Sequence, residues 1–93
     1  MSFNWEPNPG WRELDAPEER DIVQLKATNG FDVLVKLFVS HVTENKITGI
    51  VDSVYDWHNK GQIHMGHGAS LVGKEMEFDK KYMQNVIKHR DNS

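Results

Sequence analysis

Two alternating segments joined by a tight-turn dipeptide constrain the fold more than any other feature of this sequence. Residues 21–28 place apolar side chains on one face, at Val23, Leu25 and Ala27. Asn29-Gly30 follows, and both residues tolerate the positive φ of a type I′ turn. Residues 31–40 then alternate again, which predicts an antiparallel return strand. A third strand from Ile47 to Val51, extending toward Val54, completes a predicted meander.

The second face of this meander is rich in apolar side chains. Leu34, Phe38 and Ile50 lie opposite the predicted core face. A sheet with one face in water normally carries polar side chains there. We therefore expect a cover, supplied by an N-terminal arm with Trp5 and Trp11, by a C-terminal helix or by a partner. An isologous homodimer would cover this face equally well.

The C-terminal part of the chain predicts one more strand and a helix. Residues 56–73 form a polar, glycine-containing connection with room for a short strand near residues 62–65. Residues 74–78 alternate and predict a last strand, with Met76 and Phe78 directed inward. Asp79 is a good helix N-cap, and positive residues at 88–90 suit a helix end. The apolar residues between them recur at helical spacing, at Tyr82, Met83, Val86 and Ile87.

A length of 93 residues predicts one domain. Residues 1–20 hold all three prolines and are expected to form an N-terminal arm with a short helical turn capped by Asp15. Residues 21–90 are expected to form a single β-rich domain. The predicted fold class is α+β, a curled antiparallel sheet or small SH3-like barrel of four to five strands with a C-terminal helix. The predicted core comprises Val23, Leu25, Val33, Val35, Leu37, Val39, Ile50, Val51, Phe78, Met83, Val86 and Ile87.

Composition excludes several classes of function. The chain has no cysteine, so disulfides, thiolate metal sites and cysteine nucleophiles are ruled out. The formal net charge of −3 argues against a protein that coats nucleic acid or anionic membrane. No apolar run approaches the roughly 18 residues of a membrane span, and the first residues lack the pattern of a signal peptide. The sequence therefore predicts a cytoplasmic protein without a membrane partner.

No catalytic residue is predicted. Ser40 and Ser70 each have a histidine nearby in the sequence, but neither an orienting acid nor an oxyanion hole is identifiable. One alternative is a metal-dependent enzyme, because three imidazoles at His58, His64 and His67 could hold zinc together with water. No Asp or Glu lies between His58 and His67 to serve as a base. We therefore expect no cofactor.

The favoured interpretation is a non-enzymatic domain of inhibitor, immunity or adaptor type that occludes the surface of a partner protein. All three tryptophans fall outside the predicted strands, and tryptophan is enriched at interface hot spots. The predicted partner-binding residues are Trp57, His58, Trp5 and Trp11. The alternative partner is single-stranded nucleic acid, although acidic residues alternate with the lysines of the C-terminal part. The lysines predicted for that role are Lys74, Lys80, Lys81 and Lys88.

Part of the chain resembles a group of small uncharacterised bacterial β-rich domains. The resemblance spans about residues 22–87. It rests on Ile47-Thr-Gly-Ile-Val51, the glycine-rich connection, Val72-Gly73-Lys-Glu-Met-Glu-Phe78 and the closing pairs Tyr82-Met83 and Val86-Ile87. Met76 stands where that pattern has valine. Some of these domains are thought to be immunity-like, so the resemblance implies a partner-binding protein, and it supplies no catalytic residue.

Overall fold

Six antiparallel strands and three 3₁₀ turns make up residues 3–89, the part of the chain that the computed structural model describes. In chain order these are β1 (Asn4–Trp5), η1 (Trp11–Glu13), β2 (Ile22–Thr28), β3 (Asp32–Val42), β4 (Lys46–Asp56), η2 (Ala69–Leu71), β5 (Glu75–Asp79), η3 (Lys80–Tyr82) and β6 (Met83–Ile87). Within residues 3–89, no helix has both the length and the apolar character needed to cross a membrane.

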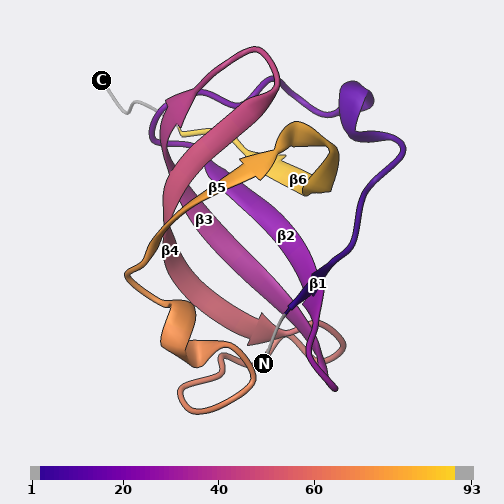
Figure 1. Cartoon of the computed structure of the whole chain (residues 1–93), viewed down its shortest axis with the longest axis vertical. Coiled ribbons are helices and arrows are strands. Elements are labelled where there is room, and N and C mark those ends of the chain that lie inside the picture. The colour runs from indigo at the N-terminus through magenta and orange to yellow at the C-terminus, as the bar shows by residue number, and fades with distance from the viewer. Residues whose placement is uncertain (1–2, 90–93) are drawn as a thin grey trace.

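The strands form one curled antiparallel sheet, a half-barrel with the order β1-β2-β3-β4-β5. β6 pairs with residues 22–25 of β2, on the edge where β1 pairs with residues 27–28. Figure 1 shows the long strands β2, β3 and β4 side by side, with η2 at one end of them and η1 at the other. Three register shifts, in the β2–β6 and β3–β4 pairs, add to the natural twist of the strands. The β-rich, curled sheet that the sequence predicts is therefore confirmed.

The first hairpin is present, but its turn differs from the predicted type I′ turn. Thr28 pairs with Asp32, so three residues rather than two connect the strands. Gly30 has a positive φ of 69°, whereas Asn29 does not have a positive φ. The Thr28 hydroxyl donates to the Asp32 carboxylate at 2.9 Å, and this bond closes the loop at its base.

The core lies on the concave side of the sheet. Ten of the twelve predicted core residues are buried, and Ala27, Ile47, Val54 and Leu71 join them. The two exceptions are Ile50 and Ile87, each of which is 43% exposed. Both lie on the opposite face, because Ile50 pairs with Phe38 and Ile87 pairs with Ile22 on the outer side of the sheet.

The predicted C-terminal helix is wrong. Only the single turn η3 follows Asp79, and residues 83–87 form strand β6 on the edge of β2. The helical spacing misled the prediction because of a β-bulge: Leu25 pairs with Met83 and Gln24 pairs with Asn85, which leaves Gln84 as an extra residue. With that extra residue, Met83 and Val86 both reach the core although they lie three positions apart.

The N-terminal arm also differs from its prediction in detail. Its helical turn is η1 at residues 11–13, before Asp15 rather than after it. Residues 62–65 supply a single bridge, between Tyr55 and Gln62, in place of a short strand. The arm does not cover the second sheet face: Leu34 is 5% exposed, but Phe38 remains 42% exposed.

A buried carboxylate ties the start of β2 to the end of β6. Asp21 is 2% exposed and accepts hydrogen bonds from Lys88 Nζ at 2.6 Å, from the His89 N–H at 2.7 Å and from the Glu18 N–H at 2.8 Å. Burial raises the pKa of the Asp21 carboxyl, but these three hydrogen bonds outweigh it and hold the pKa below its usual value. Hydrogen bonds to Asp21 and Glu18 in turn raise the pKa of Lys88.

Candidate functional site: an apolar groove beside β5

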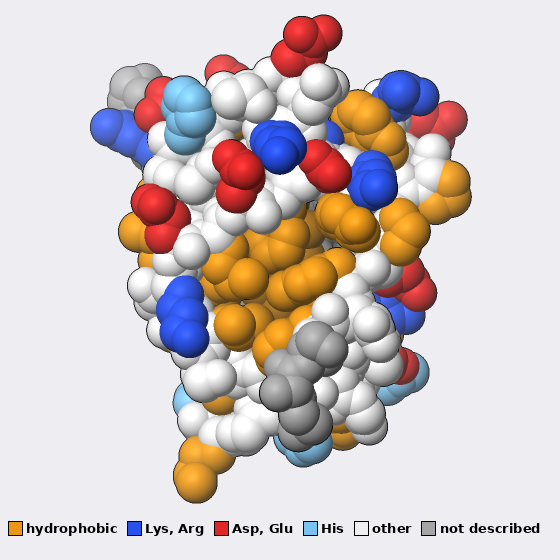
Figure 2. All heavy atoms as spheres, in the orientation of Figure 1, with side chains coloured by type: hydrophobic (Ala, Val, Ile, Leu, Met, Phe, Trp, Pro, Cys, Tyr) orange, Lys and Arg blue, Asp and Glu red, His pale blue; other side chains and the backbone are white. Residues whose placement is uncertain are grey.

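The sheet curls but leaves a gap between β5 and the N-terminal arm. β5 pairs with β4 alone, and β1 pairs with β2 alone, among the strands of residues 3–89. Figure 2 shows the face of the molecule that contains this gap: apolar side chains are exposed in a hollow at its centre, with charged side chains above them. We call this hollow the β5 groove, and its lining residues are Trp5, Lys46, Met76, Glu77, Phe78, Asp79 and Tyr82.

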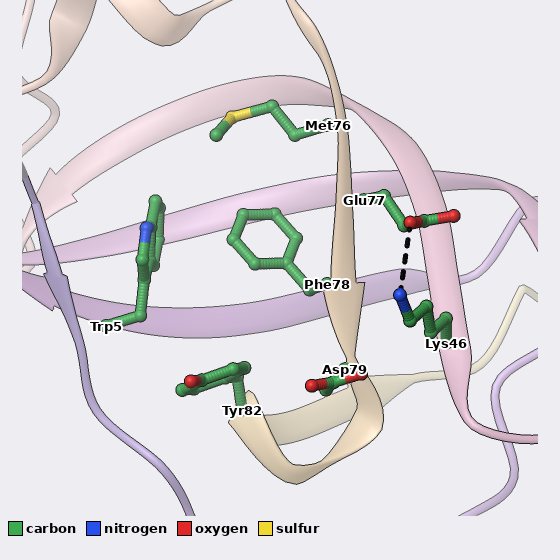
Figure 3. A pocket seen from close by; sticks show the side chains of 7 residues that line it. All are labelled: Trp5, Lys46, Met76, Glu77, Phe78, Asp79 and Tyr82. Carbon is green, nitrogen blue, oxygen red and sulfur yellow. Dashed lines mark ion pairs between the residues drawn. The ribbon is translucent and has the colours of Figure 1, made fainter.

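The aromatic part of the groove is built from both ends of the chain. Trp5 comes from β1, Phe78 from β5 and Tyr82 from η3 (Figure 3). The Trp5 and Phe78 rings meet edge to face at 4.6 Å between centroids, and the centroid of the Phe3 ring lies 5.9 Å from that of Trp5. Edge-to-face packing of this kind fixes the rings, so the apolar wall is preorganised.

Hydrogen bonds hold the arm at the groove. The Glu6 N–H donates to the Lys26 carbonyl at 2.9 Å, and the Gln84 side chain donates to the Glu6 carbonyl at 2.8 Å. The Asn8 side chain donates to the carbonyl of Met83 at 2.9 Å. These bonds link the arm to β2 and β6, which keeps Trp5 opposite β5.

The rim of the groove is charged on the convex side of the sheet. Glu77 points away from the aromatic wall, and the Lys46 ammonium lies 3.6 Å from its carboxylate, while Asp79 lies at the end of β5 near Tyr82 (Figure 3). Both partners of this pair are more than half exposed, so the pair contributes little to stability. The groove is therefore apolar on one side of β5 and acidic on the other.

The size of the groove favours side chains of a macromolecule over a small ligand. Its volume is about 280 Å³, slightly below the roughly 300–1,000 Å³ typical of small-molecule sites. Figure 2 shows it as a surface hollow rather than an enclosed cavity. Such a shape fits one or two inserted side chains.

The predicted partner-binding residues do not gather in one place. Trp5 lines the β5 groove, whereas Trp11 belongs to η1 and lines a separate hollow with Leu14 and Met83. Trp57 and His58 follow the end of β4, where the Trp57 N–H donates to the Asp32 carbonyl at 3.1 Å. The sequence predicted that Met76 and Phe78 point inward, but it did not reveal that both also line an open groove.

Trp57 lies in a cluster of lysines and aromatic rings. The ammonium groups of Lys26 and Lys60 lie 4.8 and 4.4 Å from the centroid of its ring. On the same end of the sheet, the Lys36 ammonium lies 4.7 Å from the centroid of the Tyr55 ring. These distances are within the range of cation–π attraction. None of these three lysines belongs to the set predicted for nucleic acid.

That predicted set of lysines is divided among different contacts. Lys88 donates to Asp21, to Glu18 at 2.8 Å and to the Ala16 carbonyl at 2.7 Å, so its charge is already compensated. Lys81 lies over the Tyr82 ring at 5.2 Å, while Lys80 lines the hollow beside Trp11. Lys74 lies just before β5 and is exposed.

The three histidines of the predicted metal site have other neighbours. His58 Nε2 lies 3.0 Å from the Asp32 carboxylate, and His67 stacks on Phe31 at 4.2 Å between centroids. Hydrogen bonds from His58 and from the Thr28 hydroxyl lower the pKa of Asp32. His64 is exposed. Across residues 3–89, no group of three or more His, Asp or Glu side chains is placed to hold a metal ion.

A second apolar surface runs across the convex face. Register neighbours on four successive strands form one row, which we call the outer row: Ile50, Phe38, Ile22 and Ile87. Phe38, Ile50 and Ile87 are each more than 40% exposed. Phe38 and Ile50 of this row belong to the face that the sequence predicted would need a cover, whereas Leu34, the third residue of that prediction, is buried.

No protein-family model matches this chain, and no curated protein or solved structure is significantly similar to it. The resemblance to small bacterial β-rich domains therefore stays a prediction. The candidate binding surfaces of the described residues are the β5 groove, the cluster of lysines around Trp57 and the outer row.

Proposed function

We propose that the protein is a non-enzymatic protein-binding domain that occludes part of its partner through the β5 groove. The observation that carries this proposal is the β5 groove, in which the half-buried Trp5, Met76 and Tyr82 surround the buried ring of Phe78. Aromatic residues and methionine are enriched at the centres of protein interfaces, and a charged rim commonly surrounds them. An inhibitor, immunity or adaptor role is consistent with this arrangement.

We also propose that the curled sheet is a small SH3-like barrel. The order of its strands supports this assignment: β2 to β5 form a meander, and β6 returns to pair with β2. In such an arrangement the N-terminal arm lies outside the barrel strands and only lines the groove.

The experiment is affinity capture from lysate of the source cells after nuclease treatment, with wild type and two variants compared. Met76→Arg places a charge in the apolar wall, and Val72→Arg makes the same change at an exposed residue outside the groove. We expect a near-stoichiometric protein partner with wild type and Val72→Arg, reduced at least tenfold with Met76→Arg. Equal recovery with both variants, when both show normal thermal unfolding, would refute the groove as the binding site.

Binding of single-stranded nucleic acid is the second candidate function. The supporting observation is the cluster of Lys26, Lys60 and Lys36 over Trp57 and Tyr55, since lysines could bind phosphates while the rings stack on bases. Affinity for a labelled single-stranded oligonucleotide should then fall steeply with salt. Trp57→Ala should weaken it, whereas Trp11→Ala should not. No binding at low salt would dispose of this function.

A further inference from the structure

The backbone of β5 has one edge without a strand partner. The Val51 N–H donates to the Lys74 carbonyl, and the Lys80 N–H donates to the Asn45 carbonyl, each at 2.9 Å. These two bonds show that the backbone groups of Lys74 and Lys80 face β4. In an antiparallel ladder every second residue faces the same neighbour, so the backbone groups of Met76 and Phe78 also face β4. The N–H and C=O groups of Glu75 and Glu77 therefore point the other way, toward the groove.

These groups have no backbone partner within residues 3–89. β5 pairs only with β4 there, and no hydrogen bond from a loop or turn reaches Glu75 or Glu77. Proteins usually cover or interrupt such an edge, because it is a template for another strand. Here the edge is bordered by the β5 groove, whose lining includes side chains from both faces of β5 (Figure 3).

We propose that the partner docks as an extended segment that adds a strand to the free edge of β5. This inference rests on the proposed function and specifies how the same groove is used. Strand addition supplies main-chain hydrogen bonds, and pockets for alternate side chains supply specificity. The groups of Glu75 and Glu77 would make the main-chain bonds, and Met76, Phe78 and Trp5 would receive the inward side chains.

Charge specifies the composition of that segment. The outward side chains of β5 are all acidic, at Glu75, Glu77 and Asp79. A neighbouring strand places its own outward side chains about 4.5–5.5 Å from these, where opposite charges attract and like charges repel. The partner segment therefore alternates apolar residues, which face the groove, with basic residues, which face outward.

The same argument disfavours a second copy of β5 as the occupant. Antiparallel pairing of two β5 strands would set two rows of three carboxylates against each other. The outward acidic row discourages self-pairing while leaving the edge open to a basic strand.

The test uses a blocked eight-residue peptide of alternating valine and lysine, with an alternating valine and glutamate peptide as its control. Amide hydrogen exchange of the full chain is followed residue by residue by NMR. We expect the valine–lysine peptide to slow exchange at Glu75 and Glu77 at least tenfold. The amides of Met76 and Phe78 already face β4 and should change little. Unchanged exchange at Glu75 and Glu77 at saturating peptide, or equal slowing by the control peptide, would overturn strand addition.

Two matched variants test the role of charge. Glu77→Lys should weaken binding of the valine–lysine peptide at least tenfold, and Glu19→Lys makes the same charge change at an exposed residue away from β5. Equal affinity of the two variants would overturn the proposed acidic recognition. A captured, groove-dependent protein partner that leaves exchange at Glu75 and Glu77 unchanged would overturn strand addition and leave the proposed function intact. Absence of any groove-dependent partner would overturn both.

Discussion

The Trp5 indole meets the Phe78 ring edge to face, with 4.6 Å between ring centroids and 70° between ring planes. These residues stand at opposite ends of the chain, and their contact joins the N-terminal arm to the edge strand β5. The Trp5 side chain is only half-buried. One part of the ring packs on Phe78, and the ring also forms a wall of the β5 groove.

A double-mutant cycle should measure this contact. Replacing Trp5 and Phe78 by leucine, singly and together, should give a coupling of about 0.5–1.5 kcal/mol, the range found for aromatic pairs. Urea unfolding of the four proteins provides the free energies. Effects that add to within about 0.3 kcal/mol would show that the two rings do not stabilise each other.

Asp21→Asn should destabilise the fold by about 2–3 kcal/mol at neutral pH. Breaking a fully buried ion pair costs roughly 3–5 kcal/mol, and the cost is less here because the Lys88 side chain is 34% exposed. Asp15→Asn, at an exposed residue, is the matched control. The free energy of unfolding can be measured for both by urea titration.

The same carboxyl should make stability depend on pH. Since the pKa of Asp21 is lower in the folded state than in the unfolded state, its contribution is complete above the unfolded value of about 3.9. That contribution is lost as the pH falls through the folded value. Wild type should therefore lose more stability than Asp21→Asn between pH 5 and pH 2 (roughly the window in which such a carboxyl titrates). Parallel curves for the two proteins would contradict the assignment.

Gly49→Ala should destabilise the sheet by about 1–3 kcal/mol, the usual range for overpacking a core. A Cβ at Gly49 would collide with the backbone carbonyl of Phe38 and come within 2.8 Å of Leu37 Cγ. Gly10→Ala is the control, because its added Cβ would make only ordinary contacts of 3.6 Å or more. Similar stability losses in both variants would refute the claim that β3 and β4 approach too closely for a side chain at position 49.

The outer row bears on the predicted homodimer, which remains untested. Replacing Phe38 and Ile50 together by threonine should change stability by less than about 1 kcal/mol, since both side chains are half-exposed and threonine suits a strand. If two copies associate through this row, light scattering should show dimers of wild type that the double variant cannot form. Dimers of equal stability in the variant would place the self-association elsewhere.

Strong alternation made the long strands predictable from the sequence, because it fixes which side chains reach the core. β6 was not predictable in this way. The extra residue at Gln84 spaces the buried side chains of β6 three positions apart, as in a helix. Only the pairing of this segment with the edge of β2 makes it a strand. Ile50 was predicted both on the second face and in the core, and its pairing with Phe38, which requires the register of β3 and β4, decides for the second face.

The candidate site was predictable only in part. Trp5 was expected to bind a partner, but Met76 and Phe78 had every feature of ordinary core residues. Their second role arises because the arm reaches β5 only through side chains and does not pair with it as a strand, and the arm is placed there by contacts between residues more than 70 positions apart. Alternation of apolar and acidic residues along residues 75–79 was visible, but it does not reveal which edge of a strand is free.

The most direct test of the central claim is photo-crosslinking from the groove in source cells. A photoreactive phenylalanine analogue at Tyr82, which lines the groove, is compared with the same analogue at Val72, which does not. The account predicts a discrete covalent adduct with one protein from position 82, lost when Met76→Arg is added, and none from position 72. The same adduct from both positions, or an adduct from position 82 that persists with Met76→Arg, would contradict binding through the β5 groove.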